Sequence, residues 1–154
     1  MKEYVVGFAF DGEGNVALIE KTKPAWQRGR FNGIGGKIEV DQREKPVDAM
    51  SREFFEETGV YIHPDQWNWV GGMYGNAWNN LTNHPDTEDW RVFVYTCTNP
   101  EVKNIRTTTE KEVFLWPVDM KDDRMIENVP ALIKLCSIKP EPPSKRVPYF
   151  TLEY

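Results

Sequence analysis

Three glutamates, Glu53, Glu56 and Glu57, are the side chains of this sequence whose type and spacing most clearly predict chemistry. If their segment is helical, positions i, i+3 and i+4 place the three carboxylates side by side on one face, where they repel each other. A hard divalent cation such as Mg²⁺ relieves that repulsion, because it binds carboxylate oxygens and bridges phosphates. A solvated acidic helix face is the alternative. Acids in a last helical turn oppose the helix dipole, however, which favours a metal site.

A glycine-rich segment lies shortly before these acids, with Gly33, Gly35 and Gly36 close together. Glycine lets a backbone approach a ligand closely, and the backbone groups of such turns can bind phosphate. The two features together favour a site for a metal ion and a phosphorylated ligand.

Residues 52–60 resemble the second half of the Nudix box, the signature of the Nudix hydrolase family. Glu44 stands eight positions before this segment, as the pattern requires, whereas Ile38 stands where the pattern has its first glycine. Residues 35–39, Gly-Gly-Lys-Ile-Glu, instead resemble the opening of the box, so a two-residue insertion ahead of Glu44 accounts for the mismatch. Phe54 replaces the usual Ile, Leu or Val at a position expected to face the core.

The resemblance implies an α/β (α+β) fold, the Nudix-type α/β/α sandwich with a mixed β-sheet, and a role for each matching residue. In this family water attacks a phosphorus atom while Mg²⁺ or Mn²⁺ neutralises the developing charge. The implied site residues are the metal ligands Glu53, Glu56, Glu57 and the carbonyl of Gly35, the bracing pair Glu44 and Arg52, and Lys37 beside the phosphates.

A glutamate usually serves as general base in this family, either in the box or on a later loop. Outside the box, Glu112 and Glu110 are the candidates, because both lie just before the apolar run 113–118. Exposed acids at a strand edge are the alternative interpretation of each, so the identity of the base stays open.

Residues 30–37, Arg-Phe-Asn-Gly-Ile-Gly-Gly-Lys, resemble a segment of the Nudix enzymes that hydrolyse oxidised purine nucleoside triphosphates. The resemblance implies that Asn32 reads the base edge, since its amide offers both a donor and an acceptor. Asn before Gly is also a common turn pair, which is the alternative. Four basic residues are candidates for contacts with the triphosphate, namely Lys21, Lys23, Arg28 and Arg30, and an exposed basic loop is the alternative interpretation. Trp26 and Trp78 are candidates for stacking on the base. The candidates for the base pocket are Asp122, Asp123, Glu127 and Asn128.

These patterns favour hydrolysis of a nucleoside triphosphate to a nucleoside monophosphate and pyrophosphate, with an oxidised purine as one candidate base. ADP-ribose, a nucleotide sugar or a dinucleotide are the alternative substrates. A non-catalytic nucleotide-sensing module and an acidic interaction domain without a ligand are alternatives from other functional classes. An intact set of three box glutamates disfavours the sensing module.

The elements that must position these residues follow from apolar periodicity and turn signals. A helix over 46–58, with Pro46 in its first turn and Gly59 after its end, would face Val47, Met50 and Phe54 to the core. The expected strands are a hairpin of 4–10 and 16–20, then 67–74, 90–98 and 113–118, and an edge strand 149–154, with a second helix over 129–136. The expected irregular segments are a loop over 21–30, a glycine segment 31–38 and a Pro-rich segment 139–148. A long loop over 75–89 is expected to serve as a substrate lid or a dimer contact.

The chain has 154 residues, which fits a single domain over 1–154, and a net charge of −5. This acidity argues against nucleic-acid polymers and polybasic membrane contact as partners, and leaves a small nucleotide substrate and a homodimer as candidates. Seven of the 24 acids lie between Glu39 and Glu57, so the acidity is local. Cys97 and Cys136 are expected to be buried free thiols, which suits a reducing cytoplasm.

Overall fold

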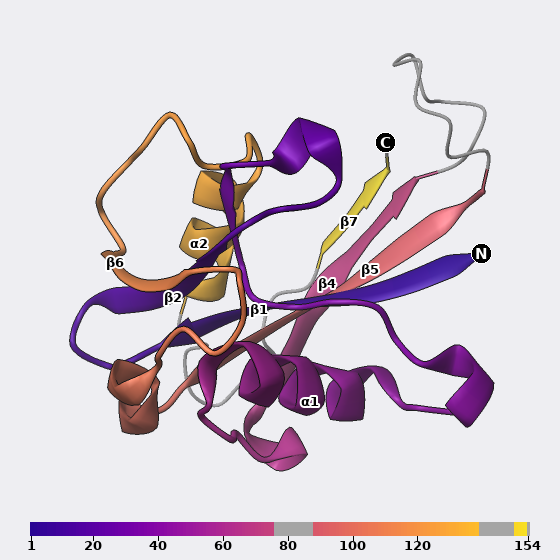
Figure 1. The fold of residues 1–154 in the computed structure, drawn as a ribbon, viewed down its shortest axis with the longest axis horizontal. Coiled ribbons are helices and arrows are strands. Elements are labelled where there is room, and N and C mark those ends of the chain that lie inside the picture. Colours follow the sequence, from indigo (N-terminus) through magenta and orange to yellow (C-terminus); the bar gives the residue numbers. More distant parts are fainter. Residues whose placement is uncertain (76–87, 139–149, 154) are drawn as a thin grey trace.

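The computed structural model of the chain describes residues 1–75, 88–138 and 150–153 (Figure 1). Within this part, three strands precede the first helix and three more precede the second, and 3₁₀ turns lie at Ala25–Gln27, Val40–Gln42, Pro64–Gln66 and Pro100–Asn104. The elements are β1 (Lys2–Phe10), β2 (Asn15–Glu20), β3 (Phe31–Asn32), α1 (Pro46–Thr58), β4 (Asn68–Gly75), β5 (Trp90–Thr98), β6 (Val113–Pro117), α2 (Val129–Cys136) and β7 (Phe150–Glu153).

The strands form one mixed sheet in the order β3-β2-β1-β5-β4-β7, and β6 pairs with β2. β1 runs parallel to β5 and β4 runs parallel to β7, whereas the other pairs are antiparallel. The mixed α+β fold expected from the sequence is therefore confirmed.

The two helices cover opposite faces of this sheet (Figure 1). Along β1, Val5 and Ala9 join the core cluster beneath α1, while Val6 and Phe8 join the cluster beneath α2. This alternation follows from the two-residue period of a strand, and it makes the sheet apolar on both sides. The molecule is thus a three-layer α/β/α sandwich.

Helix α1 has the bounds that the sequence predicts. Met50 and Phe54 are fully buried, and Gly59 ends the helix with a φ of 71° while its N–H donates to the Phe55 carbonyl over 2.8 Å. Gly7 on β1 lets the helix approach closely, because a Cβ there would lie 2.7 Å from the Met50 sulfur. The acidic box is therefore carried on a rigid, tightly packed helix.

Replacing Gly59 with Ala is expected to lower the free energy of unfolding by about 1 kcal/mol, because a side chain in the left-handed region strains the backbone. Urea denaturation measures this loss. Gly72→Ala is the control, since its Cβ would meet its nearest neighbour, the Val92 carbonyl oxygen, at an ordinary 3.5 Å. An equal loss in both variants would show that the helix terminus is not the cause.

Several expected elements differ in extent. Residues 31–38 form a strand only at β3, followed by single bridges of Ile34 to Gly7 and of Lys37 to Tyr4, because glycines interrupt the pairing. The predicted loop 21–30 contains a 3₁₀ turn, and the edge strand is present as β7. Most of the predicted loop 75–89 and the whole Pro-rich segment 139–148 lie outside the described residues.

The two cysteines, Cys97 and Cys136, are free and buried, as predicted. Burial raises the pKa of each thiol to about 12, so both stay protonated near neutral pH. Among the described residues, none of the helices is long and apolar enough to cross a membrane.

Candidate active site

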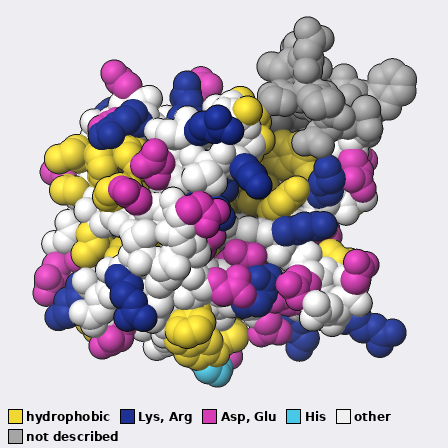
Figure 2. All heavy atoms as spheres, in the orientation of Figure 1, with side chains coloured by type: hydrophobic (Ala, Val, Ile, Leu, Met, Phe, Trp, Pro, Cys, Tyr) yellow, Lys and Arg dark blue, Asp and Glu magenta, His cyan; other side chains and the backbone are white. Residues whose placement is uncertain are grey.

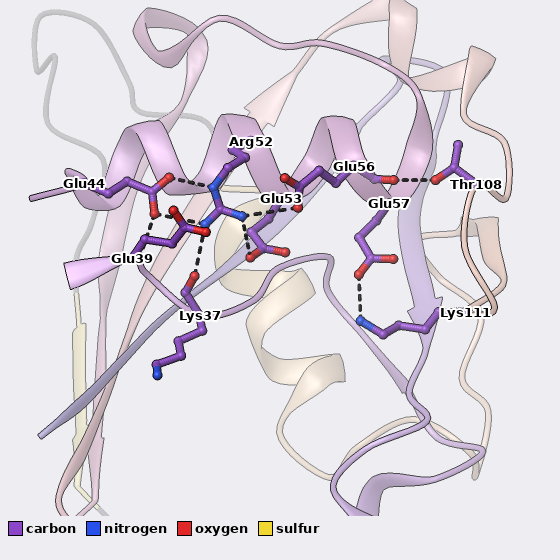
Figure 3. Close-up of polar contacts among 9 residues, drawn as sticks. All are labelled: Lys37, Glu39, Glu44, Arg52, Glu53, Glu56, Glu57, Thr108 and Lys111. Atoms are coloured by element: carbon purple, nitrogen blue, oxygen red, sulfur yellow. Dashed lines mark hydrogen bonds and ion pairs between the residues drawn. The ribbon is translucent and has the colours of Figure 1, made fainter. Parts of the chain in front are cut away.

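Arg52 is the hub of the polar contacts on α1, and its guanidinium uses all five N–H donors (Figure 3). Two bonds run to the Glu44 carboxylate, at 2.7 and 2.9 Å. The others run to Glu53 at 2.9 Å, to Glu56 at 3.2 Å and to the Lys37 carbonyl at 3.1 Å. Arg52 thus ties the loop before α1 to two of the three box glutamates.

Glu44 completes this brace from the loop side. Its second oxygen also accepts from the Glu39 N–H at 2.8 Å. The hydrogen bond from Arg52, aided by the Glu39 amide, lowers the pKa of the Glu44 carboxyl, while the carboxylates raise the pKa of Arg52. The Glu44–Arg52 pair predicted from the sequence is therefore formed, whereas the Lys37 side chain is exposed and points away from the acids (Figure 3).

The glycine segment lies between β1 and the acids of α1. The carbonyls of Ile34 and Gly36 accept from Gly7 and Val5 of β1 at 2.7 and 2.9 Å. A Cβ on Gly35 would lie 2.0 Å from the Val5 carbonyl oxygen, so this segment can pack against β1 only as glycine. Alternating carbonyls of an extended segment face opposite edges, which leaves the Gly35 carbonyl directed away from β1.

Glu53 packs directly on this segment, because a Cβ on Gly36 would lie 2.4 Å from its carboxylate. Only 13% of the Glu53 side chain is exposed. Burial raises the pKa of this carboxyl, the contact with Arg52 opposes the shift, and the charges of Glu56 and Glu57 add to it. A divalent cation at Glu53 would favour its charged form.

The Glu57 side chain is more deeply buried than that of Glu53, and its partners were not predicted from the sequence. Lys111 Nζ lies 2.7 Å from Glu57 Oε1, and Thr109 Oγ1 donates to Oε2 at 3.0 Å. Thr108 also donates to the Glu56 backbone carbonyl. The loop before β6 is therefore fastened to the last turn of α1 (Figure 3).

Lys21 joins the site from the end of β2. Ile19 pairs with Val113, and Glu20 N–H donates to the Glu112 carbonyl, so Lys21 continues β2 toward the loop that carries Lys111. Burial lowers the pKa of Lys21, the charge of Lys111 lowers it further, and the charges of Glu57 and Glu53 oppose both effects.

Glu112 and Glu110, the candidate bases outside the box, are both exposed and flank Lys111. Val113 and Leu115 pack on the α1 side of the sheet, whereas Phe114 and Trp116 pack on the α2 side. By the same alternation Lys111 belongs to the α1 side and Glu112 to the other. The structure thus brings Lys111, and not Glu112, to the box glutamates, and the catalytic role of Glu112 stays a prediction.

The predicted substrate residues lie around β3 and the preceding turn. Lys23 and Arg28 are exposed on either side of the turn at Ala25–Gln27. Asn32 is half-buried, and its Oδ1 accepts from the Gly33 N–H at 2.7 Å, which is the turn role weighed above. Trp26 is about half exposed, and Trp78 lies outside the described residues.

The segment that follows β6 returns to lie beside β3. Phe31 N–H donates to the Arg124 carbonyl, and the Arg124 guanidinium lies 4.8 Å from the centre of the Phe31 ring. The same guanidinium binds Asp122 and lowers the pKa of that carboxyl to about 2. Asp122 is therefore held near Phe31, the residue before Asn32, and the base pocket of Asp122, Asp123, Glu127 and Asn128 stays a prediction.

The donor chemistry of the site fits a hard divalent cation, since carboxylate and carbonyl oxygens gather along one face of α1 and the glycine segment. Within residues 1–75 and 88–138, however, no three acidic, His or Cys side chains converge closely enough to hold a metal ion. Glu53 and Glu56 form ion pairs with Arg52, whereas Glu57 forms an ion pair with Lys111 on the loop before β6.

An open mixed sheet between two helices, with an arginine-braced acidic helix beside a glycine segment, defines a class of phosphoanhydride hydrolase folds. The NUDIX domain matches residues 2–129, so the chain belongs to the Nudix hydrolase family. Members of this family in general use divalent metal ions. A comparison with curated protein sequences finds no match.

Solved structures of the same fold include three informative neighbours. A MutT protein from Bacillus halodurans is 20% identical, with a TM-score of 0.69 over 100% of this chain and 90% of that one. The Escherichia coli dihydroneopterin triphosphate pyrophosphohydrolase is 12% identical, with a TM-score of 0.62 over 86% and 92%. The Nudix domain of Shewanella oneidensis NrtR, in complex with ADP-ribose, is 17% identical, with a TM-score of 0.57 over 86% and 83%. At these identities the likeness establishes the fold.

Proposed function

We propose that the protein hydrolyses a nucleoside triphosphate to a nucleoside monophosphate and pyrophosphate. The observation that carries this proposal is the position of the Glu53 carboxylate, which packs on Gly36 beside the glycine segment. Metal-binding acids and a phosphate-binding backbone then share one site. Water adds its oxygen to one of the two phosphorus atoms of the α–β bridge, the bond from that phosphorus to the bridging oxygen breaks, and the nucleoside monophosphate and pyrophosphate separate.

Some residues of the site would bind the metal ion or orient its carboxylate ligands, and others would bind the phosphates. Glu53, Glu56, Glu57 and the Gly35 carbonyl would hold Mg²⁺ or Mn²⁺, which supplies charge neutralisation and a more acidic bound water. Arg52 fixes two of these carboxylates and is itself fixed by Glu44. Lys21, with Lys23 and Arg28 further out, offers cationic charge to a polyphosphate. A glutamate of the site takes the proton of the attacking water.

Two structural neighbours mark the substrate alternatives. The dihydroneopterin triphosphate pyrophosphohydrolase acts on a triphosphate, and its fold supports the triphosphate proposal. The NrtR domain binds ADP-ribose, which keeps an ADP-ribose hydrolase or a nucleotide-sensing module as the second candidate. An arginine-braced box with all three glutamates favours hydrolysis over sensing.

A substrate panel tests the proposal. Ordinary and oxidised nucleoside triphosphates, ADP-ribose and nucleotide sugars are each incubated with the protein, with and without Mg²⁺ or Mn²⁺. We expect turnover of at least one triphosphate and only in the presence of metal. Turnover of ADP-ribose alone would replace the proposed substrate class, and inactivity on every compound would favour the sensing module.

Asn32→Ala is expected to lower kcat/KM for the preferred purine nucleotide by roughly tenfold or more, because a buried base edge would lose its hydrogen-bond partner. Pyrimidine nucleotides should change little. Asn32→Asp is a second variant, since it keeps the acceptor for the Gly33 N–H, replaces the amide donor with a carboxylate oxygen and adds a negative charge. Equal losses for all bases in Asn32→Ala would show that Asn32 only supports the turn.

A small nucleotide is the proposed partner, without a nucleic-acid polymer or a membrane, and a homodimer and a cytoplasmic location remain predictions.

A further inference from the structure

The Glu57–Lys111 contact is an ion pair largely shielded from solvent. Only 7% of the Glu57 side chain and 27% of the Lys111 side chain are exposed. Lys111 occupies one carboxylate oxygen and Thr109 the other. Any cation that binds Glu57 must therefore take an oxygen that already has a partner.

A second lysine makes this arrangement unusual. Lys21 directly follows β2, and Lys111 lies two residues before β6, the strand that pairs with β2. The charge of Lys111 lowers the pKa of Lys21 and the charges of Glu57 and Glu53 raise it, so all four groups interact. The lysine pair is therefore compensated by the acids of α1, and through them it is coupled to whatever binds those acids.

The charges of the site nearly cancel without a metal ion. The four carboxylates are Glu44, Glu53, Glu56 and Glu57, and three cationic side chains, Arg52, Lys21 and Lys111, face them. Acidic and basic side chains are likewise interleaved over the face of the molecule in Figure 2. The repulsion that would draw a divalent ion to an acidic helix is thus partly relieved by the protein itself.

We propose that Lys111 is an internal counter-cation that occupies Glu57 until a divalent ion displaces it, and that it thereby weakens the metal affinity of the site. The inference rests on the proposed function for the identity of the ion. Lys111 lies outside the Nudix box and acts through Glu57, so it is a positioning residue.

Mn²⁺ binding to the substrate-free protein tests this inference by isothermal titration calorimetry. Lys111→Met should bind Mn²⁺ about tenfold more tightly than the unmodified protein, because a competing positive charge a few ångströms away is removed. Lys111→Arg, which keeps the charge, and Lys103→Met, which removes an exposed lysine elsewhere, should stay close to the unmodified protein. Unchanged or weaker Mn²⁺ binding by Lys111→Met would overturn the inference.

Thermal unfolding provides a second measurement in case Lys111→Met is less stable. Mn²⁺ should raise the Tm of this variant by more than it raises the Tm of the unmodified protein, because a ligand that binds more tightly stabilises more. An equal or smaller shift contradicts the inference. Neither experiment contains a nucleotide, so a protein that binds Mn²⁺ as expected and hydrolyses nothing would refute only the proposed function.

Discussion

Glu56→Gln is expected to lower kcat by at least about 100-fold while leaving the fold intact, because it removes a proposed metal ligand that contributes several kcal/mol of charge stabilisation. Its side chain is 53% exposed and accepts a hydrogen bond from Arg52 Nη1 at 3.2 Å. Its loss should therefore cost little folding free energy. Steady-state kinetics at saturating Mg²⁺, with a circular dichroism melt of the same sample, measures both effects.

Glu13→Gln is the control for this change, since it removes one exposed carboxylate in the β1–β2 turn, away from α1. Glu57→Gln is less informative, because it also leaves the partly buried Lys111 without its carboxylate. Full turnover by Glu56→Gln would exclude Glu56 as a metal ligand, and an equal loss in Glu13→Gln would exclude a specific effect.

Arg52→Lys is expected to lower the free energy of unfolding by about 1–3 kcal/mol, even though it keeps the charge. An ammonium has three donors and no planar fork, so it cannot reproduce the two bonds to Glu44 together with those to Glu53 and Glu56. We also expect a loss of about 10- to 100-fold in activity, since residues that orient metal ligands typically contribute this much. Urea denaturation and kcat/KM measure the two effects.

Arg43→Lys is the matched control, because Arg43 is exposed and lies beside Glu44 on the loop before α1. Unchanged stability and activity in Arg52→Lys would show that the charge of Arg52 suffices. The account of a five-donor brace would then be wrong.

The parts of the site carried by one helix could be predicted from the sequence because helical spacing alone places them. Glu53, Glu56 and Glu57 share a face of α1 by their spacing, and Pro46 and Gly59 fix where that helix begins and ends. The contact of Arg52 with Glu44 also followed, through the resemblance to the Nudix box. These features depend on short sequence separations.

The contribution of the loop before β6 could not be predicted, because it depends on strand register and on which side each residue faces. Glu110, Lys111 and Glu112 are adjacent, and a shift of one residue exchanges the side that reaches α1. The contact of Lys111 Nζ with Glu57 Oε1 at 2.7 Å settles this choice in favour of Lys111. The sequence does show Lys111 between Glu110 and Glu112. Only the two glutamates could serve as a general base, so the acids, and not the lysine, were singled out from the sequence.

The central claim, metal-dependent cleavage between the α- and β-phosphorus atoms, is tested most directly by product analysis in ¹⁸O-labelled water. With a nucleoside triphosphate that the protein turns over in the presence of Mg²⁺, we predict a nucleoside monophosphate and pyrophosphate, one of which carries a single ¹⁸O atom. Addition of EDTA should stop the reaction. Release of labelled orthophosphate with a nucleoside diphosphate, or turnover that persists without metal, would contradict the account.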